Sequence, residues 1–199
     1  MITLACLPGR RKRRCYDSRA VASGADIRLI ISDVDGVWTD GRIAYIGERS
    51  EIKVFNVRDG LAAKLAQRAG IAIALLTSRR SHALERRARE LGIVELHQGA
   101  ANKLEESERI AQKLAVSFDH VLYAGDDLPD LAPMRRVAIS AAPADAAPEV
   151  REAATWKLES AGGAGAFREI VERLLRDRGE WERLIREFAN GNKPEASST

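Results

Sequence analysis

The sequence predicts an α/β fold, a three-layer, Rossmann-like sheet of mainly parallel strands with a β-hairpin flap and no cap domain. Apolar segments of strand length alternate with helical segments, and this alternation is typical of right-handed βαβ units. The chain has 199 residues, of which 45% are hydrophobic and 31% are charged. That length and composition suit one globular domain with a sizeable core. The loops are short, and no insertion is large enough for a separate cap domain.

Each element is predicted from a local pattern. Strands are expected where short apolar runs lie between turn residues, at 27–32, 71–76, 94–97, 120–124, 137–140 and 155–158. Helices are expected where apolar residues recur at helical spacing or a glycine closes the segment, at 60–70, 81–91, 102–114, 128–135, 164–178 and 181–188. The residue pattern of segment 42–55 predicts two short strands around a turn at Gly47, and these two strands are the expected hairpin.

Charge divides the chain into a basic tail and a mildly acidic body. Residues 1–25 contain six basic residues and one acid, a net charge of +5, whereas the whole chain carries +3. We expect a disordered basic tail at 1–25, the folded domain at 26–189 and a flexible C-terminal tail at 190–199. A basic block can bind nucleic acid or anionic lipid. A solvated extension or a misplaced start codon is the favoured interpretation, so a nucleic-acid partner is not expected.

Targeting and redox features point to a cytoplasmic protein. The basic block follows the short apolar stretch, which is the wrong order for a signal peptide. No apolar run approaches the length of a membrane helix, so no membrane partner is expected. Both cysteines, Cys6 and Cys15, lie in the tail. The body therefore has neither a disulfide framework nor a cysteine metal site.

Two aspartates come directly after the first predicted strand. Alternate residues of a strand share a face, so Asp33 and Asp35 can be presented to one cavity at the carboxyl edge of the sheet. Open α/β sheets bind their ligands at that edge. Two close carboxylates repel each other and favour a cation, a proton or both. The segment Gly125–Asp130 follows a second apolar run, so Asp126 is expected at the same edge.

This set of polar residues suits phosphoryl transfer. Asp33 can attack phosphorus and form an aspartyl-phosphate. Asp35 can protonate the leaving oxygen and later deprotonate the water. Thr77 and backbone amides can hold the phosphoryl oxygens, and Lys103 can neutralise their charge. Mg²⁺ prefers oxygen ligands, and Asp33, the Asp35 carbonyl and Asp126 would supply them.

Five residues form the predicted substrate-binding set, which is Arg58, Gly60, Ser78, Arg79 and Asn102. For each of the two arginines, a surface ion pair is the alternative.

The roles of Asp127 and Asp130 stay open at this point. One of them is expected to bind the metal through water or to orient Lys103, and the other to cap the following helix.

These motifs resemble those of the haloacid dehalogenase superfamily of phosphatases. The resemblance rests on four segments in the superfamily's order, namely Asp33-Val34-Asp35-Gly36-Val37-Trp38-Thr39, Thr77, Lys103 and Gly125–Asp130. Further segments, at 55–60, 97–103 and 162–169, are similar to the capless branch that includes the 3-deoxy-D-manno-octulosonate 8-phosphate phosphatases. The similarity runs from about residue 27 to residue 178. It implies a Mg²⁺-dependent phosphatase of lipopolysaccharide biosynthesis, acting on a small phosphorylated sugar acid.

The same resemblance implies a homotetramer in which hairpins pack together and a neighbouring subunit helps to close each active site. The hairpin sequence agrees with this, because it carries more apolar residues than a lone flap needs, namely Ile43, Tyr45, Ile46, Ile52, Val54 and Phe55. Exposed apolar patches of this kind mark interfaces.

Three residues depart from that family's pattern. Ser78 and Ala62 stand where glycines are usual, and Ala164 replaces an arginine. The catalytic set is intact, and these positions indicate an altered substrate-facing set. The alternative function is a largely non-catalytic oligomerisation domain, related to the C-terminal domain of animal sialic-acid-activating enzymes. A receiver-type signalling domain fails on order, because its nucleophile lies on a later strand, which here ends in Thr77.

Overall fold

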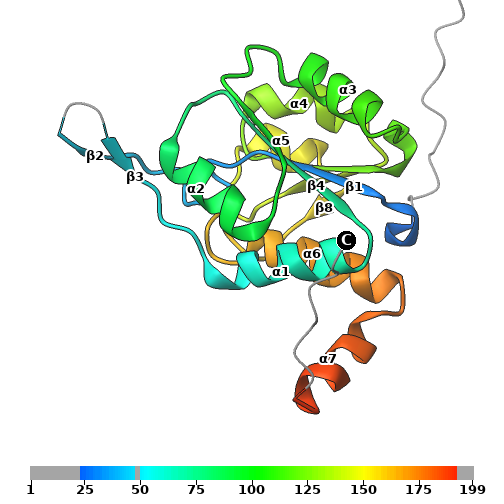
Figure 1. Ribbon diagram of the computed structural model, residues 1–199. Helices are drawn as coiled ribbons and strands as arrows, with labels where there is room; N and C mark the ends of the chain where they lie inside the picture. The colour runs from blue at the N-terminus through cyan, green and yellow to red at the C-terminus, as the bar shows by residue number, and fades with distance from the viewer. Residues whose placement is uncertain (1–22, 48–49, 192–199) are drawn as a thin grey trace, which may run out of the picture.

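The computed structural model describes residues 23–47 and 50–191. A six-stranded parallel sheet lies at its centre, in the order β5-β4-β1-β6-β7-β8 (Figure 1). Its strands are β1 (Leu29–Ser32), β4 (Ala72–Thr77), β5 (Glu95–Gln98), β6 (Val121–Ala124), β7 (Ile139–Ala142) and β8 (Trp156–Lys157). The predicted α/β fold with a mainly parallel sheet is confirmed.

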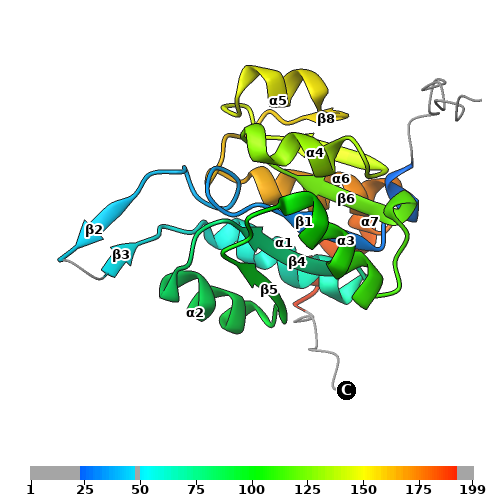
Figure 2. The ribbon, with the colours of Figure 1, turned by 90° about the horizontal axis from the view of Figure 1, so that it is seen from above.

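Helices cover both faces of this sheet (Figures 1 and 2). On one face pack α1 (Val57–Arg68), α2 (His82–Leu91), α6 (Ala166–Asp177) and α7 (Trp181–Ala189). On the other pack α3 (Lys103–Lys113), α4 (Leu131–Met134) and α5 (Pro148–Ala153). Three short 3₁₀ turns complete the described fold, η1 (Gly24–Asp26), η2 (Phe118–His120) and η3 (Leu128–Asp130). No helix in the described ranges is long and apolar enough to span a bilayer.

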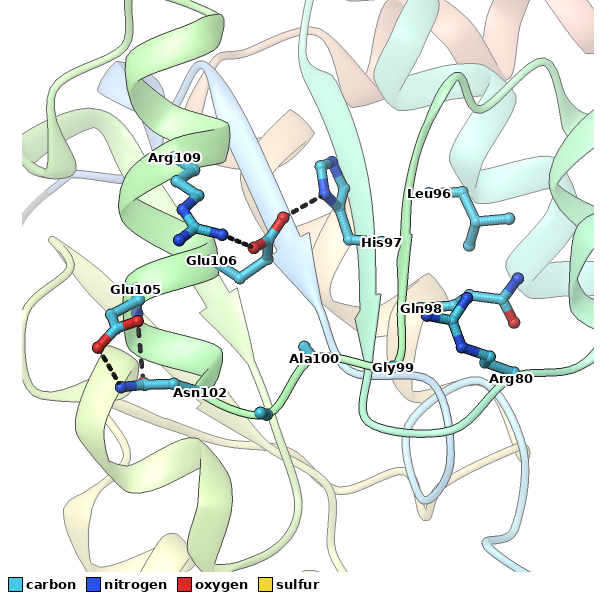
Figure 3. Close-up of a pocket in the computed structure, with 11 residues that line it drawn as sticks. Arg80, Leu96, His97, Gln98, Gly99, Ala100, Asn102, Glu105, Glu106 and Arg109 are labelled. Carbon is cyan, nitrogen blue, oxygen red and sulfur yellow. Dashed lines mark hydrogen bonds and ion pairs between the residues drawn. The ribbon is translucent and has the colours of Figure 1, made fainter.

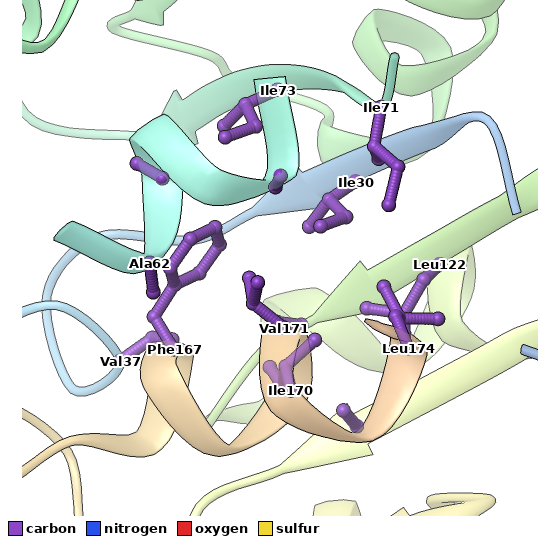
Figure 4. Close-up of a cluster of buried hydrophobic side chains, with 14 of the residues drawn as sticks. Ile30, Val37, Ala62, Ile71, Ile73, Leu122, Phe167, Ile170, Val171 and Leu174 are labelled. Atoms are coloured by element: carbon purple, nitrogen blue, oxygen red, sulfur yellow. The ribbon is translucent and has the colours of Figure 1, made fainter. Parts of the chain in front are cut away.

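The periodicity of the sequence explains the two core layers. Along β1, Ile30 joins the cluster under α1 and α6, whereas Leu29 and Ile31 join the cluster under α3 to α5. Successive strand residues point to opposite faces, so a continuous apolar run is required where both faces are covered. In α6, Phe167, Ile170, Val171 and Leu174 recur at helical spacing and meet Ile30 and α1 (Figure 4).

The hairpin stands apart from these layers. Strands β2 (Ala44–Ile46) and β3 (Ser50–Ile52) pair antiparallel, with Tyr45 opposite Glu51, and project beyond the body of the domain (Figures 1 and 2). The predicted position is confirmed, although each strand has only three residues. The hairpin follows the Asp33 loop directly along the chain, so it begins at the carboxyl edge of the sheet.

Several boundaries differ from the prediction. The segment expected as one helix at 128–135 divides into η3 and α4. It contains Pro129 and Pro133, which have no amide hydrogen and so cannot join one continuous helix. Helix α5 was not predicted, since its alanine-rich surroundings carry no apolar period. It begins at Pro148, a favoured first helical residue.

The folded part also begins slightly before the predicted boundary between 25 and 26. In η1, the Gly24 amide donates to Asp177 Oδ2 of α6 at 3.2 Å. The remainder of the predicted basic tail, 1–22, and most of the predicted C-terminal tail, 192–199, lie outside the described residues.

Candidate active site

The carboxyl ends of three neighbouring strands bring the predicted catalytic residues together. Strand β1 pairs with β4 on one side and β6 on the other. Asp33 follows β1, Thr77 ends β4, and Asp126 follows β6. Lys103 opens α3, whose N-terminus points to the same edge. Residues more than 90 positions apart in the sequence therefore line one site, as the topology of parallel strands requires.

A buried ion pair lies at the centre of this site. Lys103 Nζ is 2.7 Å from Asp33 Oδ2 and 2.7 Å from Asp130 Oδ1. The Val34 amide donates to Asp33 Oδ1 at 2.7 Å, so both oxygens of the predicted nucleophile have partners. Thr77 is also buried, and its hydroxyl accepts from the Arg79 amide at 3.1 Å. These contacts hold Asp33 in one orientation toward the edge of the sheet.

Asp130 holds the ammonium group of Lys103 in position. It is fully buried, and besides Lys103 it accepts the Tyr123 hydroxyl at 2.7 Å and the amides of Asp126 and Asp127 at 3.2 and 3.3 Å. The Asp127 side chain is exposed and accepts from the Leu128 amide at 2.8 Å. The two roles left open by the sequence are thereby divided: Asp130 orients Lys103, and Asp127 caps η3.

The acidic residues of the site fit a divalent cation. One carboxylate oxygen each from Asp33, Asp126 and Asp130 lie within 4.8 Å of one another. Burial, followed by the neighbouring carboxylates, raises the pKa of Asp126 to about 8 and that of Asp33 to about 6. Asp126 Oδ1 is buried without a hydrogen-bond partner. Asp130 already accepts from four donors, whereas each Asp33 oxygen has one partner and Asp126 Oδ1 has none, so Asp33 and Asp126 are the side chains that would hold a metal ion.

A glycine is required beside these carboxylates. Gly36 has φ +90°, and a Cβ there would collide with the Asp126 carboxylate. The glycine after Asp35 therefore lets the β1 loop approach the β6 loop closely.

Comparison with known proteins gives the site its context. Residues 73–170 match the family model described as haloacid dehalogenase-like hydrolase. The chain is 40% identical over 169 residues to the 3-deoxy-D-manno-octulosonate 8-phosphate phosphatase KdsC of Escherichia coli strain K12, an alignment covering 83% of this chain and 90% of that protein.

Solved structures agree. One is the 3-deoxy-D-manno-octulosonate 8-phosphate phosphatase of Moraxella catarrhalis in complex with magnesium ion, phosphate ion and KDO, with TM-score 0.81 and 35% identity over 83% of this chain and 95% of that one. Another is the cobalt-bound deoxy-D-mannose-octulosonate 8-phosphate phosphatase of Haemophilus influenzae, with TM-score 0.81 and 35% identity over 84% and 99%.

The chain belongs to the haloacid dehalogenase-like hydrolases. It is a phosphatase of that family, and the resemblance inferred from the four motifs is confirmed. The largely non-catalytic alternative is not supported, because the chain is 40% identical to a phosphatase and the predicted catalytic residues Asp33 and Lys103 lie in contact at one edge of the sheet.

Asp35, the predicted acid–base residue, has partners that the sequence analysis missed. Asp35 Oδ1 accepts a hydrogen bond from Lys53 Nζ of the hairpin, and Asp35 Oδ2 lies 3.9 Å from Arg79 Nε. Arg79 in turn donates to Glu51 Oε2 at 2.7 Å. The alternation Glu51-Ile52-Lys53-Val54 signals a strand with one polar face. Nothing in that spacing shows that the polar face meets Asp35.

The other predicted substrate contacts take separate positions. Ser78 and Arg58 are exposed, Arg58 in the first turn of α1. The Asn102 side chain caps α3 by accepting from the Leu104 amide at 3.1 Å. Gly60 is buried in α1, where a Cβ would collide with Arg87. For Gly60, a larger residue would displace the Arg87 guanidinium, and its role toward substrate stays a prediction.

The glycine-rich segment 161–165 packs on the catalytic loop. The Gly163 amide donates to the Val37 carbonyl at 3.0 Å, and a Cβ on Gly162 would collide with the Gly36 carbonyl. Ala62 lies in the core near Phe167, with 0% of its surface exposed (Figure 4). The interpretation of Ala62 as part of an altered substrate-facing set is therefore wrong, because its side chain fills space between α1 and α6.

A polar cavity of about 580 Å³ lies beside the catalytic cluster (Figure 3). Its floor is the loop 98–101, which is tied to the sheet edge by hydrogen bonds from the Ala100 amide to the Thr77 carbonyl and from the Gly99 amide to the Arg79 carbonyl. Its walls include Arg80 and, on α3, Asn102 and Arg109. Neither Asp33 nor Asp126 lines it, so this cavity lies beside the carboxyl edge of the sheet and does not include those two carboxylates.

Proposed function

We propose that this phosphatase hydrolyses 3-deoxy-D-manno-octulosonate 8-phosphate through an aspartyl-phosphate on Asp33. The observation that carries the proposal is the buried Asp33–Lys103 pair, 2.7 Å apart, beside Asp126 at the carboxyl edge of the sheet. The 40% identity to a phosphatase of that name supports the substrate. The structure of the Moraxella catarrhalis protein, solved with phosphate and KDO, supports it further.

The geometry supports a two-step reaction. In the first step, an Asp33 carboxylate oxygen forms a bond to phosphorus, the ester P–O bond breaks, and Asp35 gives its proton to the leaving oxygen. In the second step, Asp35 takes a proton from water, the water oxygen bonds to phosphorus, and the Asp33–phosphorus bond breaks. Lys103 and the amides near Thr77 stabilise charge on the phosphoryl oxygens in both steps.

The proposed cofactor is Mg²⁺, held by the Asp33 and Asp126 side chains with the Asp35 carbonyl. When bound, it would supply the positive charge that the acidic cluster lacks and would offset the repulsion between Asp33 and an anionic phosphate. Two unit charges about 4 Å apart interact with about 4 kcal/mol at an effective dielectric constant near 20.

We propose in addition that the chain forms a homotetramer through its hairpins and that a neighbouring subunit completes each site. Tyr45 is 72% exposed, Ile46 58% and Val54 74%. Ile43, Ile52 and Val57 are exposed as well, so large apolar side chains are exposed from the hairpin to the start of α1. An isolated two-stranded hairpin is marginally stable in water. Light scattering should give about four times the 21.8 kDa chain mass.

A substrate panel tests the proposed reaction. Phosphate release should be fastest with 3-deoxy-D-manno-octulosonate 8-phosphate among octulosonate, nononate and hexose phosphates, in the presence of Mg²⁺. EDTA and the variant Asp33→Asn should each abolish turnover, and Asp119→Asn, the same change at an exposed position, should not. Wild-type turnover in Asp33→Asn or in EDTA would disprove the mechanism, and preference for another sugar phosphate would disprove the substrate.

A further inference from the structure

Four charged side chains form a closed ring where the hairpin meets the catalytic loop. Lys53 contacts Asp35 and lies 3.6 Å from Glu51 Oε1. Arg79 lies 3.9 Å from Asp35 and 2.7 Å from Glu51. Positive and negative members alternate around the ring, so each cation has two anionic neighbours. Three segments contribute to it: the hairpin strand β3 and the residue after it, the β1 loop, and the loop after β4.

Lys53 is the most enclosed member of this ring. Its side chain is 3% exposed, against 19% for Asp35 and 37% for Arg79. A buried ammonium group needs anionic or polar partners at fixed positions. In this structure those partners are carboxylates of Asp35 and Glu51, so the position of Lys53 and the orientation of Asp35 depend on each other.

The two oxygens of Asp35 differ in their surroundings. Oδ1 accepts the hydrogen bond from Lys53. Oδ2 is buried and has no hydrogen-bond partner, and the same is true of Arg79 Nε and Glu51 Oε1. Buried polar groups normally have partners. Asp35 Oδ2, which lies 3.9 Å from Arg79 Nε, is therefore the oxygen of this carboxylate that makes no hydrogen bond within the ring.

We propose that Lys53 is a positioning residue for the acid–base step: by holding Asp35 Oδ1, it presents Oδ2 to the ester oxygen of the substrate. The inference rests on the proposed function, which assigns Asp35 that step. The role of Lys53 in this step is to fix the orientation of the Asp35 carboxylate. It also ties the geometry of the chemical step to the hairpin, since Lys53 follows directly on β3.

A pair of aryl phosphates tests this role. Phenyl phosphate and p-nitrophenyl phosphate have nearly the same shape, but phenolate needs protonation as it leaves far more than p-nitrophenolate does. In Lys53→Met, kcat/KM for phenyl phosphate should fall roughly tenfold or more, a part of the 10²–10⁴-fold that acid–base catalysis contributes. For p-nitrophenyl phosphate the loss should stay within about threefold. Lys53→Arg keeps a donor and should recover most of the difference.

The matched control is Lys157→Met, the same change at an exposed residue of β8, which should leave both esters unaffected. Equal losses for the two aryl esters in Lys53→Met would overturn the proposal, because phosphate binding or general structure would then explain them. A loss confined to 3-deoxy-D-manno-octulosonate 8-phosphate would also overturn it and make Lys53 a sugar contact. A wild type that hydrolyses the aryl esters but not the octulosonate ester would disprove only the proposed substrate.

Discussion

The catalytic edge and the hairpin are neighbours, but they are stabilised in opposite ways. At the edge, Asp33, Thr77, Lys103 and Asp130 are all buried, and their polar groups bond to one another and to the backbone. The hairpin consists of two three-residue strands, and its apolar side chains, such as Tyr45, face outward. The polar contacts of the first region all come from one chain, whereas the second region has an apolar surface without a core of its own.

The polar contacts of the edge and those of the hairpin are therefore maintained in different ways. Asp33 and Lys103 start from elements anchored in the sheet and in α3, so the core holds them in place. Lys53 belongs to the hairpin segment, so its contact with Asp35 depends on the hairpin keeping its position. Asp35 therefore lies between a region held by the core and a hairpin that we expect a partner subunit to support.

The largest expected effect is at Asp130, the hub of the buried region. Asp130→Ala removes the acceptor of Lys103 and Tyr123 and leaves a buried ammonium beside Asp33 alone. Breaking a buried pair costs about 3–5 kcal/mol of the free energy of unfolding. We expect a loss of that size in urea denaturation, and a fall in kcat of roughly 100-fold, comparable to removal of one preorganised electrostatic group.

Asp127→Ala is the matched control for that experiment. It removes an exposed cap three residues away and should cost about 1 kcal/mol, with kcat nearly unchanged. If Asp130→Ala were no more harmful than Asp127→Ala, the catalytic edge would not depend on its buried hub.

The next effect is expected at the hairpin. Ile46→Asp places a charge on a side chain that is 58% exposed, so the free energy of unfolding of one subunit should change by no more than about 0.5 kcal/mol. The proposed homotetramer should dissociate in light scattering, and activity should fall with it. Val94→Asp, at a position 87% exposed, should preserve both assembly and activity. Loss of assembly with unchanged kinetics would show that the hairpin is only structural.

An effect on stability, dependent on pH, is expected at Asp59, where α1 follows the hairpin. Its Oδ1 accepts the Arg168 amide of α6 at 2.7 Å, and Oδ2 is buried without a partner. Burial raises the pKa of Asp59 from 3.8 to about 6, against lowering contributions from the Arg168 amide and the charges of Arg168 and Arg87. Between these values the folded chain binds more protons than the unfolded chain, so this group's contribution to stability falls as pH rises from about 4 to 6.

Asp59→Asn keeps the acceptor for the Arg168 amide and removes the titration. It should be more stable than the wild type at pH 7.5 by up to about 3 kcal/mol, and the difference should shrink toward pH 4. Urea denaturation at several pH values measures it. Parallel stability curves for the two proteins would show that folding does not raise the pKa of Asp59.

Much of the site could be predicted because three of its four motifs occupy strand ends and the fourth, at Lys103, opens a helix. The apolar run before Asp33 and the run before Asp126 identify two buried parallel strands, and the strand preceding Thr77 is read in the same way. Ligands of such sheets bind at their carboxyl ends, so the residue types and their order were sufficient to place them together. The division of roles between Asp127 and Asp130 was not predictable, because it depends on which side chain turns toward Lys103.

The sequence by itself determined the layers of this protein and the composition of its catalytic edge, because apolar periodicity and strand-end motifs are formed by residues that lie close together along the chain. Only the tertiary structure decided the partners of those residues. Lys53 reaches Asp35 from 18 positions away, Tyr123 supports Asp130, and Ala62 turns into the core instead of toward substrate. Such contacts depend on how separate elements pack in space, and spacing along the chain carries no record of the distance between two packed surfaces.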